Sequence, residues 1–180
     1  MEAKPGRVFW FTGLSGAGKT TVGRRFFALL RTRMPASVFL DGDILREVFG
    51  SDLGHSREQR LISSMRNSRM CKMLSDQGID VVCATISLSR EVQTWNRAHI
   101  PGYHEFYLRV PMRVLLERDQ KQLYSRALRG EVTEVMGIDQ PVEEPLCPEF
   151  TVENDGSELP AVLARRIFGR FVDGSGVTQE

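Results

Sequence analysis

The feature that most restricts the fold of this chain is a glycine-rich octapeptide near its N-terminus. Residues 13–20 read G-L-S-G-A-G-K-T, which matches the pattern G-x-x-x-x-G-K-[ST] in full. The preceding residues, Arg7–Phe11, have the apolar character of a short buried strand, and after Thr20 apolar residues recur at helical spacing as far as Pro35. A strand, such a loop and a helix, in this order, form the context in which the pattern binds phosphate groups. We therefore expect a phosphate-binding loop at the end of a buried strand.

Each residue type in this loop has a role in holding a nucleoside triphosphate. Glycines let successive backbone amides turn toward phosphate oxygens, the lysine places a positive charge beside the β- and γ-phosphates, and the threonine hydroxyl is a ligand for Mg²⁺. The following helix directs its N-terminal dipole at the same phosphates. We therefore expect ATP and Mg²⁺ as cofactors, bound by Gly13, Ser15, Gly16, Ala17, Gly18, Lys19, Thr20 and Thr21.

The rest of the chain alternates between strand-like and helix-like segments. Further strands are expected at Ser37–Leu40, Ile79–Ile86, Glu105–Val110 and Phe150–Val152, and further helices at Leu61–Leu74, Glu91–Ala98, Pro111–Arg118 and Leu159–Phe171. We expect Gln77 and Gly78 to end the first of these helices, as glycine commonly does. The alternation predicts an α/β fold, a three-layer doubly wound parallel sheet of about five strands.

Length and charge limit the classes of function. The 180 residues suit a single domain, 1–180, and 24 Lys and Arg balance 23 Asp and Glu to a net charge of +1. This balance argues against binding of nucleic acid through its phosphate backbone, and no apolar run is long enough for a membrane span. The cysteines form no C-x-x-C pair and the histidines show no zinc-ligand spacing. With a short polar N-terminus, these features predict a cytoplasmic protein without disulfides or a transition metal.

One segment departs from the alternation of strands and helices. Residues 119–148 are mostly polar, contain two glycines and three prolines, and offer few side chains for a core. Loops of this length in a compact domain are either disordered or functional, and lids over active sites are a common case. We expect a mobile lid here.

Two carboxylates follow the second expected strand. Asp41 and Asp43 are separated by Gly42, at the kind of strand end where doubly wound sheets bind nucleotides. One carboxylate can assist the metal while the other orients or deprotonates an attacking hydroxyl. The alternative is structural, because aspartate is a preferred N-cap and Ile44–Phe49 has helical character. We expect the catalytic residues to be Lys19, Asp41 and Asp43, with Thr20 and Asp43 at the metal.

Taken together, the motifs resemble those of the adenylylsulfate (APS) kinases. F-T-G-L-S-G-A-G-K-T-T, L-D-G-D-x-L-R and D-L-G-H-S-x-E-x-R follow one another in the family's order and spacing. E-R-D-x-K-x-L-Y-x-x-A and G-E-V-x-x-x-x-G-I-D are similar to the family's lid, so the resemblance extends from Val8 to Asp155. It implies an ATP-dependent kinase that phosphorylates the ribose 3′-hydroxyl of a small nucleotide-linked acceptor, adenylyl sulfate.

The resemblance also implies roles for residues outside the phosphate-binding loop. Asp43 would lie nearest the attacking hydroxyl and the metal, with Asp41 as its supporting partner. Arg118 would bind the nucleotide where the lid begins, and the closed lid would exclude water. The acceptor side would comprise Asp43, Arg46, His55, Arg60, Ser63, Ser87, Lys121 and Val135. Because the family often forms dimers, a homodimer is a further expectation.

Changes from the family pattern fall on the acceptor side. His55 and Val135 replace two phenylalanines whose rings, in the family, enclose the acceptor's adenine, and Ser63 replaces an asparagine. After the third expected strand, S-P-Y has become S-L-S, at residues 87–89. Base–aromatic stacking contributes about 1–3 kcal/mol per base, so loss of both rings weakens adenine binding unless His55 stacks. The chain thereby also resembles a capsule-associated branch of the family that phosphorylates cytidine diphosphoramidate, and this acceptor is an alternative to adenylyl sulfate.

Two other functions are compatible with a phosphate-binding loop. A nucleotide sensor would bind ATP tightly and form no phosphorylated product, and the intact carboxylate pair argues against it. A GTPase-like hydrolase would need an N-K-x-D motif to read its base and a D-x-x-G motif at a strand end. Neither motif follows an expected strand in this chain.

Overall fold

The computed structural model describes residues 4–174, so residues 1–3 and 175–180 of the predicted domain lie outside the described part. The strands are β1 Val8–Thr12, β2 Ser37–Asp41, β3 Asp80–Ala84, β4 Tyr103–Arg109 and β5 Phe150–Glu153. The α-helices are α1 Lys19–Arg33, α2 Gly42–Val48, α3 Arg57–Asp76, α4 Arg90–His99, α5 Met112–Arg118, α6 Leu123–Leu128 and α7 Pro160–Phe171. A short 3₁₀ helix, η1 Gln120–Gln122, precedes α6.

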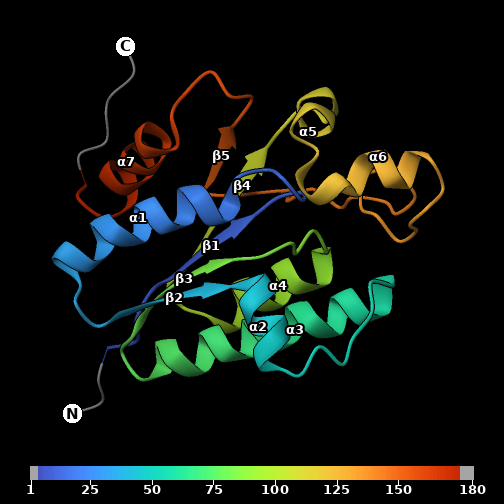
Figure 1. Ribbon diagram of the computed structural model, residues 1–180. Helices are drawn as coiled ribbons and strands as arrows, with labels where there is room; N and C mark the ends of the chain where they lie inside the picture. Colours follow the sequence, from blue (N-terminus) through green and yellow to red (C-terminus); the bar gives the residue numbers. More distant parts are fainter. Residues whose placement is uncertain (1–3, 175–180) are drawn as a thin grey trace.

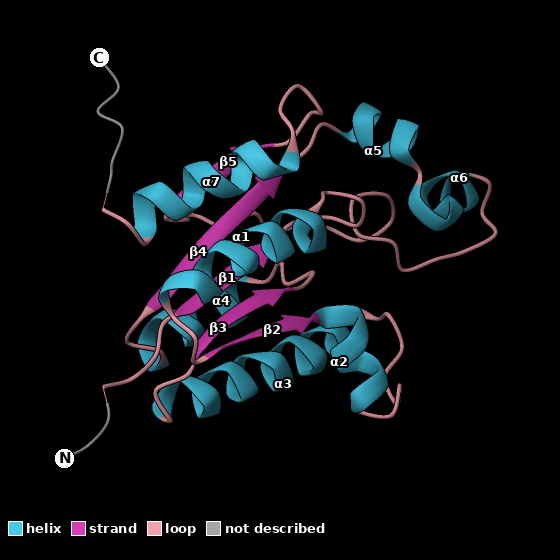
Figure 2. Cartoon of the chain, turned by 60° about the vertical axis from the view of Figure 1, so that its left-hand side comes forward, coloured by secondary structure: helices cyan, strands magenta, loops and turns pink. Residues whose placement is uncertain are grey.

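The strands form one parallel sheet in the order β2-β3-β1-β4-β5. Helices α1 and α7 pack against each other on one face, while α3 and α4 cover the other (Figures 1 and 2). The predicted three-layer doubly wound sheet is therefore confirmed. Within the described residues, no helix has the length and apolar character that a bilayer span requires.

The middle of the sheet is apolar on both of its faces. All five residues of β1 and all five of β3 are buried, as expected of parallel strands covered by helices on each side. One core cluster, between the sheet and α1 and α7, contains Phe9, Phe11, Phe26 and Phe106, and a second, under α3 and α4, contains Trp10 and Cys83. The central strand is thus held rigidly, and so is the loop that leaves its carboxyl end.

Helix α3 starts earlier than the sequence pattern predicts. The expected start at Leu61 is wrong because Ser56 acts as the N-cap, its Oγ accepting a hydrogen bond from the Gln59 amide at 3.3 Å. The predicted end is confirmed, since Gly78 has φ +80° and its amide bonds to the Ser75 carbonyl at 2.8 Å. The longer helix brings Arg57 and Arg60 into its first turn, close to the carboxyl edge of the sheet.

The segment expected to be a lid extends beyond the carboxyl edge of the sheet and carries η1 and α6 (Figure 1). As expected, the described residues of this segment offer few side chains for the core. Tyr124 is 1% exposed and Val135 is 4% exposed, and both belong to the core cluster that includes Leu115. An isolated β-bridge between Met136 and Gln140 closes its second half. In this structure the segment is packed on the domain, and its opening motion stays a prediction.

Candidate active site

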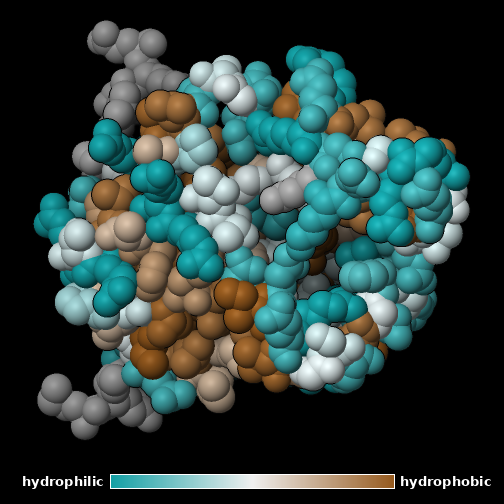
Figure 3. Space-filling view, in the orientation of Figure 1, coloured by the Kyte–Doolittle hydropathy of each residue, from teal (hydrophilic) through white to brown (hydrophobic). Residues whose placement is uncertain are grey.

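A cavity of about 400 Å³ lies at the carboxyl ends of β1, β2 and β3. Figure 3 shows the molecular surface hollowed on this side, with mainly hydrophilic side chains around the hollow. The sheet topology explains its position, because parallel strands direct their carboxyl ends, and the loops that follow them, to one edge. The cavity brings together most of the site residues expected from the sequence, namely Ser15, Gly16, Gly18, Lys19, Thr20, Thr21, Asp41, Asp43, Arg46, His55, Arg60, Ser63 and Lys121.

The phosphate-binding loop follows β1 directly and ends at the N-terminus of α1. Gly18 is the N-cap residue of α1 with φ +88°, a conformation that strains any residue with a Cβ. Gly13 is held close to the neighbouring strand, since a Cβ there would lie 2.6 Å from the Leu108 carbonyl oxygen. The amides of the loop and of the first helical turn are therefore gathered at one point, as anion binding requires.

Lys19 is the one positive charge that the loop itself supplies. Its side chain is buried and its Nζ donates a hydrogen bond to the Leu14 carbonyl at 2.7 Å. Burial lowers the pKa of Lys19 from 10.5 to about 8, although Asp43 and Asp41 raise it in part. The ammonium is therefore poorly solvated without a ligand, which favours pairing with an anion that enters the cavity.

Asp41 has a structural role and a role in the site at once. One of its carboxylate oxygens accepts the Asp43 amide at 3.0 Å and so caps α2, which is the alternative that the sequence left open. The other accepts a hydrogen bond from the Thr20 hydroxyl at 2.8 Å. Because that hydroxyl donates its proton to Asp41, its lone pairs are left available for a cation.

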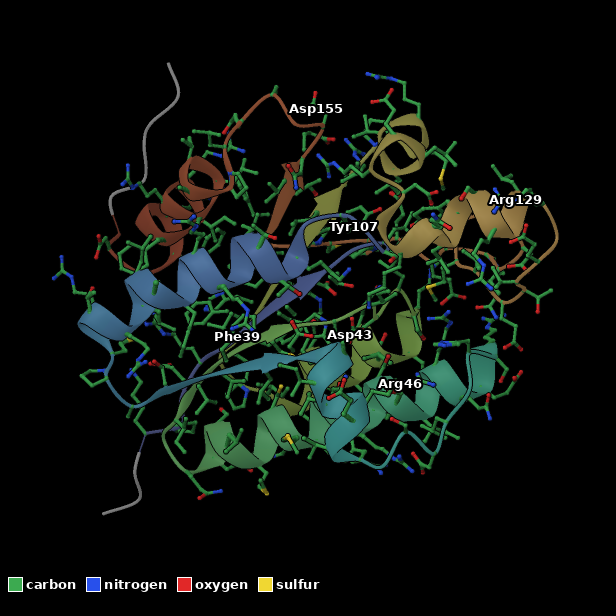
Figure 4. The ribbon with its side chains drawn as sticks, in the orientation of Figure 1. Phe39, Asp43, Arg46, Tyr107, Arg129 and Asp155 are labelled. Atoms are coloured by element: carbon green, nitrogen blue, oxygen red, sulfur yellow. The ribbon has the colours of Figure 1, made fainter. Side chains whose placement is uncertain are left out.

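Asp43 is placed differently from Asp41, although only one residue separates them. Its side chain is 84% exposed and lies 3.5 Å from the ammonium of Lys121, which belongs to the segment 119–148. Figure 4 shows Asp43 and Arg46 on α2, beyond the end of β2. The Asp43 carboxylate is therefore accessible to a ligand that lies between the loop and α2.

The oxygen donors of Thr20 and Asp43 fit the requirements of Mg²⁺. Among the described residues no group of three or more His, Cys, Asp or Glu side chains could hold a metal ion by itself. Mg²⁺ does not need such a group, because it commonly takes one or two protein oxygens and completes its coordination with phosphates and water. The site therefore suits a metal that arrives with a nucleotide.

Arg46 and Arg60 line the end of the cavity away from the phosphate-binding loop. Both also bond to the loop between α2 and α3, which borders the cavity. Arg46 donates to the carbonyls of Leu53 and Gly54, while Arg60 Nε donates to the carbonyl of His55 at 2.8 Å. Burial and the Arg46 charge lower the pKa of Arg60, and burial and both arginines lower the pKa of His55. This end of the cavity is therefore strongly electropositive, with a neutral imidazole beside two guanidinium groups.

Sequence and structure comparisons identify the family. Residues 5–153 match the adenylylsulphate kinase family. The chain belongs to this family. An adenylyl-sulfate kinase of Chloroflexus aurantiacus is 40% identical over 160 residues, which cover 89% of this chain and 86% of that protein. A cytidine diphosphoramidate kinase of Campylobacter jejuni is 37% identical over 138 residues, which cover 77% of this chain and 81% of that protein.

A solved structure agrees in fold. The Mycobacterium tuberculosis APS kinase CysC in complex with AMPPNP and APS has a TM-score of 0.82 and 31% identity, over 91% of this chain and 96% of that chain. The protein is therefore a phosphotransferase of the APS kinase family, an ATP-dependent kinase with a nucleotide substrate.

In the present protein a second cavity, of about 330 Å³, adjoins the first. Arg60, Ser64 and Ile86 line both cavities. Ser87, expected on the acceptor side, lines the second cavity, where it is 2% exposed. No described group bonds to its Oγ. From the segment 119–148, Met136, Gln140, Pro141 and Glu143 also line this cavity.

Several of the site residues expected from the sequence line neither of the two cavities of this protein. Gly13 and Ala17 belong to the phosphate-binding loop but are buried beneath it, and Val135 lies in the core. Arg118 lies on the outer side of the loop, where its Nη1 donates to the Gly16 carbonyl at 3.2 Å. The proposed roles of Val135 and Arg118 in ligand binding stay predictions.

The residues expected at the site did not include two polar residues that directly follow strands. Thr85, directly after β3, lines the first cavity, and its Oγ1 would lie only 2.8 Å from a Cβ at Gly42, which accounts for the glycine between the two aspartates. Asn154, directly after β5, is buried and donates from Nδ2 to the Ala17 carbonyl at 2.8 Å. Both residues directly follow a strand, at the edge of the sheet where the site lies. A polar residue at such a position is the sequence feature that could have identified them.

Proposed function

We propose that this protein transfers the γ-phosphoryl group of ATP, bound with Mg²⁺, to a ribose 3′-hydroxyl of a nucleotide-linked anionic acceptor. The observation that carries the proposal is the continuity of one cavity from Lys19 and Thr20 to Asp43, Arg46 and Arg60. A triphosphate at the loop and an anion at the two arginines then face each other across the exposed Asp43 carboxylate.

On the donor side, the chain supplies charge and fixed amides. Lys19 offsets charge on the β- and γ-oxygens, and the Thr20 hydroxyl, oriented by Asp41, offers its lone pairs to Mg²⁺. The metal, when bound, neutralises charge on the transferred group. Catalysis of phosphoryl transfer rests mainly on such positioning and charge neutralisation.

On the acceptor side, Asp43 orients the attacking hydroxyl and accepts its proton as the new bond forms. Arg46 and Arg60 bind the acceptor's phosphate-derived anion through their guanidinium groups. Lys121, 3.5 Å from Asp43, links this carboxylate to the segment 119–148. Closure of that segment over both ligands would exclude water, which otherwise competes with the acceptor hydroxyl.

We propose that the acceptor's base is cytosine and that it lies where the two cavities adjoin, between His55, which lines the first cavity, and Ser87, which lines the second. None of the described residues lining the second cavity is aromatic, and His55, which lines the first, has the one aromatic ring among the described residues that line either cavity. Adenine would therefore lose the stacking surface that the family pattern provides, whereas a smaller pyrimidine needs less of it. The buried, unpartnered Ser87 hydroxyl offers a hydrogen bond to the polar edge of a base. Similarity to the Campylobacter jejuni cytidine diphosphoramidate kinase supports this choice.

Adenylyl sulfate is the second candidate acceptor. It is supported by the 40% identity to the Chloroflexus aurantiacus adenylyl-sulfate kinase and by the fold shared with the APS-bound Mycobacterium tuberculosis enzyme. Both acceptors place a ribose hydroxyl beside an anionic phosphate derivative, so the mechanism above applies to either of them.

The test compares the two acceptors at equal concentration, with ATP and Mg²⁺, and maps the phosphorylated position by NMR. We expect a higher kcat/KM with cytidine diphosphoramidate. The matched variant His55→Phe restores one ring and should raise kcat/KM for adenylyl sulfate about tenfold more than for the cytidine-linked acceptor. Preference of the unaltered protein for adenylyl sulfate would establish the second candidate, and ATP binding without any phosphorylated product would support the nucleotide sensor. The expected homodimer stays a prediction that analytical ultracentrifugation tests.

A further inference from the structure

The outer side of the phosphate-binding loop is bonded to side chains from distant parts of the chain. Tyr124 Oη donates to the Ser15 carbonyl at 2.8 Å, and Asn154 Nδ2 donates to the Ala17 carbonyl at 2.8 Å. Neither Tyr124 nor Asn154 lines either of the two cavities. These two side chains therefore contact the loop on the side away from the cavities and do not face the ligands.

The direction of these carbonyls fixes the direction of two amides. In a planar trans peptide the carbonyl and the following N–H point opposite ways, and no described peptide bond is cis. The carbonyls of Ser15 and Ala17 point outward, so the amides of Gly16 and Gly18 point toward the cavity. The Ala17 amide is already used, since it donates to the Leu14 carbonyl at 3.1 Å.

The amides of Gly16 and Gly18 have no acceptor among the described residues. They are the donors that a phosphate oxygen would find. Rotation of either peptide unit by a half turn would replace an N–H with a carbonyl oxygen, and this would repel an oxyanion. A glycine-rich loop permits such rotation, because glycine has little conformational preference. An external restraint on the carbonyls therefore has a direct effect on phosphate binding.

Both restraining side chains are themselves rigidly held. The Tyr124 ring is 1% exposed within the main core cluster. Asn154 is 6% exposed, and its amide donates to the Arg109 carbonyl at 2.9 Å, so it continues the ladder of β5. Arg118 adds a bridge, since its two terminal nitrogens donate to the carbonyls of Gly16 and Asn154 at 3.2 and 2.9 Å.

The Tyr124 contact also joins the loop to the segment 119–148. Tyr124 belongs to α6, and its amide and that of Ser125 donate to Asp119 Oδ1 at 3.0 and 3.2 Å. The Ser15 carbonyl is thus held only while α6 is packed on the domain. The loop geometry that binds phosphate then depends on the position of this helix.

We propose that Tyr124 and Asn154 are positioning residues for the nucleotide. By bonding the carbonyls of Ser15 and Ala17, they turn the amides of Gly16 and Gly18 toward the phosphates, and Tyr124 makes the first of these orientations depend on α6. The proposal rests on nucleotide binding by the loop, which is part of the proposed function, and does not depend on the acceptor's identity.

The test measures ADP binding calorimetrically, without acceptor, for Tyr124→Phe and Asn154→Ala. Tyr124→Phe keeps the buried ring and removes only the donor, and we expect its Kd for ADP to rise about tenfold, the equivalent of one hydrogen bond of about 1.4 kcal/mol. In ¹⁵N spectra, the ADP-induced shift of the Gly16 amide should shrink in Tyr124→Phe and that of Gly18 in Asn154→Ala. The KM for the acceptor should stay within twofold of the unaltered protein's value.

The matched control is Tyr103→Phe. Tyr103 Oη is also buried and donates to Glu105 at 3.2 Å, but it lies at the opposite end of the sheet from the loop, so ADP binding should not change. A Kd for ADP within twofold of the original in both site variants, or an equal loss in the control, would overturn the inference. Failure of the unaltered protein to bind ADP would instead overturn the proposed function. If Tyr124→Phe does not fold, the ADP-induced shift of the Gly18 amide in Asn154→Ala still tests the inference, and an unchanged shift would overturn it.

Discussion

The affinity for nucleotide should fall steeply above pH 8, and the cause is a single buried lysine. Burial lowers the pKa of Lys19 to about 8 in the ligand-free protein. A bound polyphosphate raises it again, because a neighbouring negative charge favours the ammonium form. Above pH 8, binding must therefore include uptake of one proton, and the affinity becomes dependent on pH.

The size of the effect follows from this pKa. At pH 7 about 90% of Lys19 carries its proton, and at pH 9 about 10% does, so Kd for ADP should rise about tenfold over this range. Above pH 9 each further unit should cost about another factor of ten, or about 1.4 kcal/mol. Tyr124, whose pKa burial raises to about 12, stays protonated throughout the range.

The assay is calorimetric titration of Mg–ADP at half-unit steps from pH 7 to 9.5. Repeating it in buffers of different ionisation enthalpy gives the number of protons taken up, which should approach one above pH 8. The control is Lys19→Arg, in which the charge persists at every pH of the series, so its affinity should be nearly constant. A flat profile for the unaltered protein, or an equal slope in Lys19→Arg, would refute the reasoning.

Two further predictions concern the aspartates. Asp43→Asn should lower kcat about 10²-fold or more while ADP affinity changes little, because Asp43 is exposed and acts on the hydroxyl; an unchanged turnover in a steady-state assay would contradict its role. Asp41→Ala should lower the free energy of unfolding by about 2–3 kcal/mol in urea titration, since it removes both the cap of α2 and the bond from the Thr20 hydroxyl. A loss below about 0.5 kcal/mol would indicate that Asp41 serves the site alone.

The sheet and the phosphate-binding loop could be predicted because their signals are local. The runs around Phe9 and Val82 are apolar without interruption, as central parallel strands must be, and the loop motif occupies eight consecutive residues. The bounds were less exact where capping decides them. Ser56 starts α3 by bonding to the Gln59 amide, which an apolar-periodicity argument does not detect.

Contacts between distant residues could not be predicted in the same way. Tyr124 bonds to a carbonyl 109 residues away, and nothing in a polar segment indicates which of its few apolar side chains will be buried. Asn154 is a single residue outside any motif. Its contact with the loop follows only from the strand order, because β5 ends near the loop through its pairing with β4, which in turn pairs with β1.

The strand order has a consequence for how such enzymes diverge. The phosphate-binding loop leaves the middle strand, β1, and most of the groups assigned to the acceptor follow β2 and β3, whereas Lys121, Val135 and the groups that brace the loop follow β4 and β5. Substitutions on one flank therefore need not disturb the other. Grafting residues 42–67 and 85–90 from a relative with another acceptor should transplant its acceptor preference and leave the ATP half of the enzyme as it was, which makes the domain a natural subject for chimeras.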